Sequence, residues 1–389
     1  MQNAKNESTK SPNLPLTGIL VVDLTRVLAG PYCSMMLADL GARVIKVEHP
    51  GGGDTTRGWG PPFDASGESA YYLSINRNKE SIVLDLATEG GRSSVKTLAS
   101  RADVLLENFA PGALDRLGIS LEKLRADNPR LVTGSVTGFG RAGPDRDAVG
   151  FDLLAQAGGG LMWVTGDPDG PPQKVGMAVS DVIAGYNLAV GVLAALAART
   201  QTGGGDRVEV DLFSSTVGML PNYTQSCLVS GSEAARFGTG HAQIVPYQMF
   251  EASDGDFILA VGTERQFRNL CERVVDRPDW KDDPRFASNA VRVANRLVLL
   301  PLLAETFRAG RKDDWLARCR AAGVPAGPVR GPLEALRSPQ AEALGLVRKA
   351  GDFRTVASPI RLGSCEPPLR RPPKLGEHSE KIKKEFGLP

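Results

Sequence analysis

Histidine and cysteine, which supply most protein ligands for transition metals, are scarce in this 389-residue sequence. The three histidines are His49, His241 and His378, and they are too few and too dispersed to predict a histidine-based metal centre. The five cysteines are odd in number and contain no C-x-x-C pair, which argues against a zinc site and a disulfide framework. We therefore expect no metal and a reducing compartment.

The sequence also lacks a strong charge of one sign and a long apolar run. Lys+Arg 46 against Asp+Glu 44 gives a formal net charge of +2, so no global field predicts binding to nucleic acid or to an anionic membrane. No stretch of about 18 residues is apolar without a charge or a glycine, so no membrane span is predicted. The polar first 13 residues lack the apolar core of a secretory signal, and we expect a frayed tail and a cytoplasmic protein.

Short β-rich runs alternate with helical runs between residues 16 and 139. Strands are predicted at 19–24, 44–48, 82–86, 104–106 and 131–136, and helices at 31–40 and 89–100. This alternation predicts right-handed βαβ units, and hence an α/β domain with a Rossmann-like, mostly parallel sheet. Ligands of such sheets bind at the carboxyl ends of the strands. The segments that follow the predicted strands include 25–29, 48–51, 107–109 and 137–139.

A segment rich in Gly and Pro, residues 50–78, interrupts this alternation and predicts an irregular binding loop. It runs into Asn76-Arg-Asn-Lys79, where Arg77 and Lys79 are candidates for phosphate contact; ordinary surface charge explains them equally well. The segment Gly138-Phe-Gly-Arg-Ala-Gly143 matches the G-x-G-x-x-G pattern of dinucleotide sites. We reject that interpretation, because the motif follows the fifth strand and continues into a turn instead of a helix.

A single acid, Asp181, lies in the otherwise apolar and small-residue stretch 175–187. Residues 182–198 are dense in Ala, Leu and Val and predict a buried helix, with Ser180 or Asp181 as its N-cap. The functional alternative is a poorly solvated carboxylate at a helix N-terminus, which is competent to attack an activated carbonyl. The stretch alone does not distinguish a capping Asp from a nucleophile.

The second half of the chain has a different pattern. A strand is predicted at 207–212 and a helix at 213–228, and residues 244–322 predict a smaller α+β domain. The glycine-rich segment Phe237-Gly-Thr-Gly-His241 is either a mobile cover with free N–H groups or a plain linker. We expect a tail at 1–15, a large domain at 16–205, linkers and the small domain at 206–330, and at 331–389 a segment that returns to the large domain.

Eight segments, in order along residues 16–376, resemble the class III coenzyme A transferases of the CaiB/BaiF type. These segments are 23–31, 40–48, 53–57, 76–79, 107–112, 137–140, the stretch around Asp181, and 323–328. The family nucleophile is an aspartate, and the matching position is Asp181. The resemblance implies a CoA-transferase in which CoA passes through an aspartyl anhydride and an aspartyl-CoA thioester, without ATP, metal or a permanently bound cofactor. Gly238 and Gly240 match the family's glycine loop over the active site, which favours function for that segment.

The resemblance also implies contacts to coenzyme A, with His49 standing where relatives often carry Arg. The implied contact residues are Arg26, Val27, Ala29, His49, Leu73, Arg77, Lys79, Asn108, Phe109 and Arg116.

Within the family, the segments 54–62, 71–79 and 238–247 resemble the succinyl-CoA-dependent enzymes that act on C4–C6 dicarboxylic acids. A second carboxylate needs a cation or a donor array, for which Arg26, Arg77 and His241 are candidates. Two alternatives are an α-methylacyl-CoA racemase and a catalytically silent acyl-CoA-binding homologue. The racemase branch uses a His where this chain has Phe151, and phenylalanine cannot take up a proton. The intact Asp181 and glycine segment argue against the silent homologue.

The family fold implies a large domain completed by the returning segment, a smaller domain, and two long linkers. In such proteins each chain is a ring threaded through its partner, so the resemblance implies an interlocked homodimer.

Overall fold

The structure is a computed structural model that describes residues 14–363 and 365–389, in two compact units. The first unit comprises the chain up to Leu161, then Val175–Thr224 and Ala343–Pro389; the second comprises Met162–Lys174 and Gln225–Glu342. These boundaries differ from the predicted ones at 205 and 330. The first unit extends past residue 205 because the next strand pairs within its sheet. The tail expected at 1–15 lies outside the described residues except for its last two.

The first unit is built on a six-stranded sheet in the order β3-β2-β1-β4-β5-β6, and every neighbouring pair is parallel. The strands are β1 (Leu20–Asp23), β2 (Arg43–Glu48), β3 (Lys79–Val83), β4 (Val104–Glu107), β5 (Val132–Thr137) and β6 (Arg207–Asp211). The predicted α/β class is therefore confirmed. The third strand begins three residues before its predicted start, since its first residues are charged and buried.

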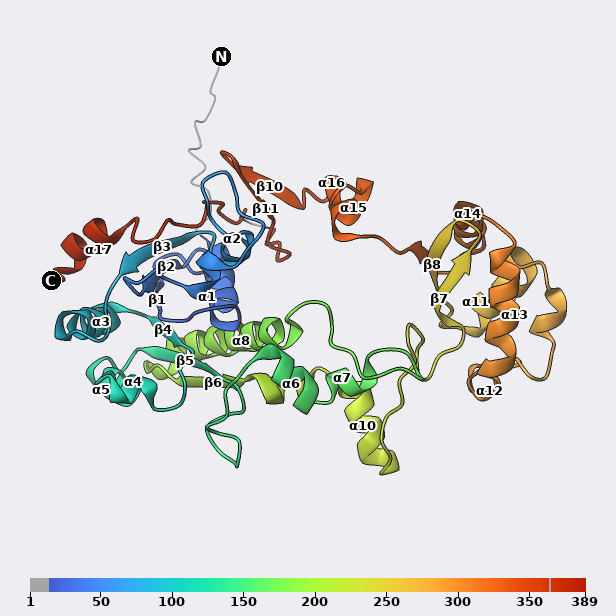
Figure 1. Cartoon of the computed structure of the whole chain (residues 1–389), viewed down its shortest axis with the longest axis horizontal. Helices are drawn as coiled ribbons and strands as arrows, with labels where there is room; N and C mark the ends of the chain where they lie inside the picture. The colour runs from blue at the N-terminus through green and yellow to red at the C-terminus, as the bar shows by residue number, and fades with distance from the viewer. Residues whose placement is uncertain (1–13, 364) are drawn as a thin grey trace, which may run out of the picture. The chain divides into compact units, whose positions relative to one another are not determined.

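Helices pack on both faces of this sheet, and alternate residues of β1 show why. Val21 belongs to a core shared with α1 (Ala29–Asp39) and the long α8 (Val179–Thr202), which lie side by side in Figure 1. Val22 belongs to a second core. That core is shared with α3 (Glu89–Arg101), α5 (Leu121–Asp127) and α17 (Ser379–Phe386). A strand buried on both faces carries apolar residues at successive positions, as β1 does.

The other elements of the first unit are short, and two of them correct predictions. Residues 50–78 hold a 3-10 turn (Thr55–Gly58) and α2 (Ala70–Ile75), where an irregular loop was predicted. The helix predicted at 213–228 is two helices, α9 (Leu212–Gly218) and α10 (Pro221–Ser230), and most of α10 belongs to the second unit. The remaining elements are α4 (Ala113–Arg116), α6 (Asp152–Gly158), α7 (Leu161–Val164), which continues into the second unit, β10 (Val347–Ala350) and β11 (Phe353–Val356).

The second unit pairs a three-stranded antiparallel sheet with helices, as predicted for residues 244–322. Its strands are β7 (Tyr247–Ala252), β8 (Gly255–Ala260) and β9 (Ala326–Pro328). Its helices include α11 (Glu264–Asn269), α12 (Asn289–Ala294), α13 (Arg296–Arg308), α14 (Lys312–Ala322), α15 (Pro332–Leu336) and α16 (Pro339–Ala343). Aromatic side chains, including Phe257, Phe307 and Trp315, fill the core between the sheet and the helices.

By length and composition, α8 could cross a membrane. In the structure one face of this helix packs in the core, where Leu188 and Val192 are fully buried against the sheet and α1. Gly185 lets the two helices approach closely: a Cβ at this position would lie 2.6 Å from the carbonyl oxygen of Ala29.

Candidate active site

The loops that follow β1 and β4 meet where the strand order reverses, the usual ligand-binding position of an open α/β sheet. The backbone N–H of Arg26 donates to Asn108 Oδ1 at 2.9 Å, and Asn108 Nδ2 donates to the Arg26 carbonyl at 2.7 Å. The Arg26 guanidinium lies 4.8 Å from the centre of the Phe109 ring. Three residues predicted from strand ends and family resemblance are thus brought together.

Asp181 is the third residue of α8, in its first turn. The prediction that Ser180 or Asp181 is the N-cap is wrong, because the cap position is Ala178, whose side chain offers no acceptor. The acceptor is Asp152, at the start of α6: its Oδ1 accepts from the N–H of Ser180 at 2.8 Å and of Asp181 at 3.4 Å. A carboxylate at this position satisfies orphan donors and interacts favourably with the helix dipole.

Asp152 is in turn held by Gln156, one helical turn further along α6. Gln156 is fully buried, and its Nε2 donates to Asp152 Oδ2 at 2.7 Å while its Oε1 accepts from the N–H of Val175 at 2.9 Å. The pair therefore fixes the segment that leads into α8. The sequence analysis did not predict Asp152 as a site residue. The chain separation of 29 residues gave no sign of its hydrogen bond to Asp181.

A cavity of about 380 Å³ in the first unit contains Asp181. Arg26 is the one Lys, Arg or His among the described residues that line it. Predicted site residues in the lining are Asp181, Arg26, Val27, Ala29, Asn108 and Phe109, joined by Asp152, Phe151, Thr55 and Gly138. The cavity thus brings five other predicted residues together with Asp181.

Asp181 is partly buried, and its nearest charged neighbour is another carboxylate, Asp152. Burial and the neighbouring Asp152 carboxylate raise the pKa of Asp181 from 3.8 to about 7. Tyr71, on α2, shares this environment: burial and the charges of Asp181, Asp152 and Asp54 raise the pKa of its hydroxyl to about 12. Tyr71 therefore remains a protonated donor at neutral pH. The sequence signal for it was only its place in the 71–79 family segment.

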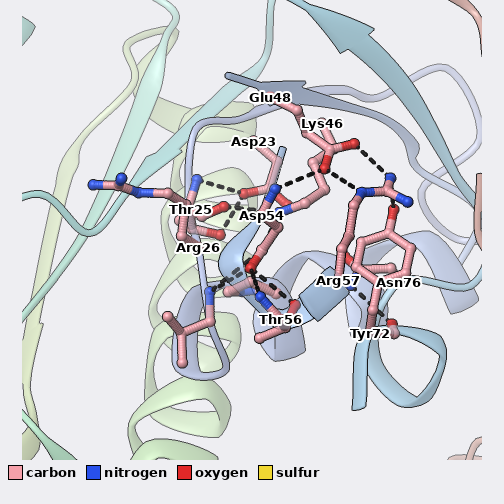
Figure 2. Close-up of polar contacts among 12 residues, drawn as sticks. Asp23, Thr25, Arg26, Lys46, Glu48, Asp54, Thr56, Arg57, Tyr72 and Asn76 are labelled. Carbon is pink, nitrogen blue, oxygen red and sulfur yellow. Dashed lines mark hydrogen bonds and ion pairs between the residues drawn. The ribbon is translucent and has the colours of Figure 1, made fainter. Parts of the chain in front are cut away.

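A network of buried charges lies beneath the loops at the ends of β1 and β2 (Figure 2). Lys46 Nζ contacts Asp54 Oδ2 at 2.9 Å, and both side chains are fully buried. Glu48 pairs with Arg57 at 2.8 Å, and Arg57 Nη2 also donates to the hydroxyl of Tyr72 at 2.6 Å. Burial alone would raise the pKa of Asp54, yet Lys46 and the hydrogen bonds from Thr56 lower it below its usual value.

Arg77 and Lys79 belong to the buried ionic structure, so they are not placed for the predicted phosphate contact. Arg77 pairs with Asp39 at 2.5 Å. Lys79 is fully buried, contacts Asp23 at 3.4 Å and donates to the carbonyl of Pro31 at 2.9 Å. Burial lowers the pKa of Lys79 to about 8. The sequence could not show this, because no local pattern distinguishes a buried, paired Lys or Arg from an exposed one.

His49, Leu73 and Arg116 are predicted contact residues that lie outside the cavity lining. His49 is exposed after β2, and its Nδ1 accepts from the N–H of Gly51 at 2.9 Å. Leu73 is half-buried on α2, and Arg116 is exposed at the end of α4.

Gly238, Gly240 and His241 belong to the second unit, whereas Asp181 belongs to the first. Gly238 has a φ of +57°, a conformation that suits glycine, and its N–H donates to the carbonyl of Gly166 at 3.1 Å. His241 Nδ1 accepts from the N–H of Gln243 at 3.0 Å.

Comparisons with known proteins show the family to which the chain belongs. The family model described as CoA-transferase family III matches residues 16–379. The chain is 42% identical over 391 residues to the succinate–glutarate CoA-transferase of Agrobacterium fabrum, covering 97% of this chain and 98% of that protein. It is 39% identical over 381 residues to the acetyl-CoA:oxalate CoA-transferase of Acetobacter aceti, covering 97% of each. The crystal structure of a CAIB/BAIF family protein from Brucella suis superposes with a TM-score of 0.87 at 42% identity, covering 96% of this chain and all of that one.

Proposed function

The chain belongs to CoA-transferase family III and is a CoA-transferase, and we propose that it moves coenzyme A from succinyl-CoA to a small dicarboxylic acid. In this proposal Asp181 is the covalent nucleophile. One observation carries the proposal: a water-poor carboxylate whose pKa is raised to about 7 lies in the cavity where the strand order reverses. A carboxylate of this kind is more basic and less solvated than an exposed one, and both properties favour attack on a carbonyl carbon.

The proposed reaction conserves the thioester energy. A carboxylate oxygen of Asp181 attacks the thioester carbonyl carbon, the carbon–sulfur bond breaks, and CoA leaves as the thiolate. The thiolate then attacks the side-chain carbonyl carbon of the resulting anhydride, which releases succinate and leaves CoA on Asp181 as a thioester. The acceptor carboxylate repeats these steps in reverse, which forms its own CoA thioester and restores Asp181. Water must be excluded throughout, because both intermediates hydrolyse.

Arg26 is the proposed partner of the second carboxylate. It is the cation in the described lining of the Asp181 cavity, whereas Arg77 is paired with Asp39. The relatives named for glutarate and oxalate both act on dicarboxylic acids. An Arg–carboxylate pair is a charge-assisted, geometrically selective contact.

Selectivity measurements with Arg26→Gln test this role. We expect KM for glutarate to rise about 10-fold or more, because a hydrogen bond to a charged group is worth roughly 1.5–3 kcal/mol. The kinetics of a monocarboxylic acid of the same length should change little. Arg354→Gln removes an exposed arginine outside the cavity and serves as the control. Equal loss for both acids would assign Arg26 to another role, such as contact with CoA.

The decisive experiment for the nucleophile is intact-protein and peptide mass spectrometry after incubation with succinyl-CoA, followed by trapping with hydroxylamine. We expect a hydroxamate on the peptide that carries Asp181, and none in Asp181→Asn. CoA binding without modification or turnover across a panel of acids would overturn the proposal and favour a silent acyl-CoA-binding homologue.

The racemase alternative is not favoured. Proton transfer at the α-carbon needs a titratable group, and the position where that branch uses a His is occupied by Phe151, which lines the cavity and has no proton to exchange. Loss of label from an α-deuterated acyl-CoA without an acceptor acid would revive that alternative.

We also propose the interlocked homodimer that the family resemblance implies. An interlocked dimer cannot separate without unfolding, so its mass in native mass spectrometry should be that of two chains at every dilution. Subunit exchange between labelled and unlabelled protein should occur only after denaturation and refolding. Monomers at nanomolar concentration would refute the interlocking.

A further inference from the structure

Val27 lines the Asp181 cavity in a backbone conformation that valine rarely adopts. Its φ is +71°, in the left-handed region, where a branched Cβ crowds the following carbonyl. The other non-glycine residues with positive φ in the described chain are Asn78 and Asp276, of types that tolerate it better. Strained backbone of this kind persists where the surroundings over-determine it, and such positions cluster at functional sites.

Asp54 and Lys46, both labelled in Figure 2, contact the backbone of Val27 and of Thr25, respectively. The N–H of Val27 points at the Asp54 carboxylate, with both oxygens at 3.3 Å. Lys46 pairs with that carboxylate at 2.9 Å and donates to the carbonyl of Thr25, also at 2.9 Å. One buried ion pair therefore fixes the backbone on both sides of Arg26, whose own N–H and carbonyl are held by Asn108.

Asp54 is itself tightly placed. Its Oδ1 accepts from the N–H of Thr56 at 3.0 Å and from the Thr56 hydroxyl at 2.8 Å, and its backbone N–H donates to Glu48 Oε1 at 3.1 Å. The next residue, Thr55, lines the same cavity as residues 26–29. The pair thus joins two cavity-lining segments from the ends of β1 and β2.

A contribution to stability alone does not account for this pair. Both side chains are wholly buried, and replacing a buried ion pair by uncharged groups of similar volume is often neutral for stability. An apolar pair would lack two groups. One is the acceptor for the N–H of Val27, which keeps that residue left-handed, and the other is the donor to the carbonyl of Thr25.

We propose that Lys46 and Asp54 are positioning residues for the transfer reaction: they hold Val27 in its left-handed conformation, and so keep residues 26–29 in their place around the Asp181 cavity. This inference rests on the proposed function, because its consequence is the placement of the acyl group against the nucleophile. Neither residue lines the described cavity, so each acts through the loop and not through contact with substrate.

A double-mutant cycle with Val27→Gly tests the proposal. The paired substitution Lys46→Met with Asp54→Leu removes the ion pair together with the oxygens that accept from the Val27 N–H. We expect kcat/KM to fall about 100-fold, mainly through kcat, since misplacement by about 1 Å is enough for such a loss. Glycine adopts positive φ without strain. In the Val27→Gly background the same paired substitution should therefore cost about threefold or less, a coupling that a general loss of stability would not produce.

A matched control uses a partly buried ion pair near the amino ends of the strands, away from the cavity. Arg199 pairs with Asp103 at 2.9 Å, and Asp103 also accepts from the N–H of Leu20 at 2.8 Å. Arg199→Met with Asp103→Leu should lower stability without changing kcat/KM of the folded protein. Equal losses with and without the Val27→Gly substitution, or full activity without Lys46 and Asp54, would overturn the proposal.

Amide hydrogen exchange separates this inference from the proposed function. In the absence of substrate, the Val27 amide should exchange faster in the Lys46→Met, Asp54→Leu protein than in the wild type, and the Leu20 amide should not. If the wild-type protein transfers no CoA, the proposed function fails and exchange at Val27 still decides whether the pair holds the loop. Unchanged exchange at Val27 would refute the positioning role.

Discussion

The carboxylate of Asp181 is subject to two opposing requirements. Burial and Asp152 raise its pKa to about 7, which makes the ionised form more basic and a better nucleophile but also less populated at neutral pH. Asp152 also has a structural role, because it accepts hydrogen bonds from two N–H groups in the first turn of α8. The same side chain therefore places the nucleophile and tunes its ionisation.

The pH dependence of transfer should report this tuning. Because Asp181 must be ionised to attack, kcat/KM should rise with pH below about 7 and level off above it. Asp152→Asn removes a like charge, which lowers the pKa of Asp181, so the acid limb should move to lower pH. Steady-state transfer measured from about pH 5 to 9 checks both statements. Asp127→Asn, at an exposed carboxylate on α5 outside the cavity, should leave the acid limb in place. An acid limb that does not move in Asp152→Asn would contradict the assignment.

Asp181→Asn should abolish transfer yet stabilise the protein. The folded-state pKa is raised from 3.8 to about 7, so ionised Asp181 destabilises the fold; the penalty is absent below about pH 4, grows up to about pH 7, and is complete above it. We expect transfer to fall at least about 10³-fold and the free energy of unfolding to rise by about 1–3 kcal/mol at about pH 8. Urea unfolding at about pH 4.5 and about pH 8 measures the difference between the variants. Equal stability at the higher pH would mean that Asp181 is better solvated than its burial indicates.

At the scale of elements, the site depends on how closely α1 approaches α8. The cavity-lining loop runs directly into α1, and Asp181 lies in the first turn of α8. Gly185, about one turn after Asp181, meets the carbonyl of Ala29 where α1 begins. The distance between the two helix N-termini is therefore set by the absence of a side chain at residue 185.

Gly185→Ala tests that dependence. Its Cβ would lie 2.6 Å from the Ala29 carbonyl oxygen, a backbone atom that can move only with α1. We expect a loss of about 1–3 kcal/mol from overpacking and a fall in kcat/KM of about 10-fold or more. Gly218→Ala, in α9, has no atom within 4 Å of the new Cβ and should leave both unchanged. Thermal unfolding and kinetics of the two variants, measured side by side, decide the matter; full activity in Gly185→Ala would show that the helices tolerate separation.

The sequence predicted the parts of the site that follow local rules. The apolar runs predicted where the strands end, and the carboxyl ends of parallel strands meet at one edge of a sheet. Residues 25–29 and 107–109 were therefore expected near a ligand, and both segments contribute to the cavity lining. The cap of α8 and the partners of Lys79 could not be predicted, since they come from segments far along the chain. A buried charge leaves no local sequence pattern, because the residue that pairs with it lies elsewhere in the chain.

At the scale of the whole molecule, the two units differ in the chemistry of their interiors. The first unit buries carboxylates beside cations: Asp23 with Lys79, Asp54 with Lys46, and Glu48 with Arg57. Burial would raise the pKa of each of these acids, yet the neighbouring cations lower it below its ordinary value. The core of the second unit is mostly aromatic and aliphatic, around Phe257 and Phe307. Acid should therefore act mainly on the first unit.

We expect the first unit to unfold at a higher pH than the second during acid titration. A carboxyl group with a lowered folded-state pKa stabilises the fold above its unfolded pKa, here 3.8 for Asp and 4.5 for Glu, and this contribution is lost as pH falls through the lower folded value. Loss should begin below about pH 4. Trp280 and Trp315 are buried in the second unit, so their fluorescence should persist after hydrogen exchange shows β1 to β3 opening. A single transition seen at the same pH by both probes would mean that the buried carboxylates do not set the acid stability of the sheet.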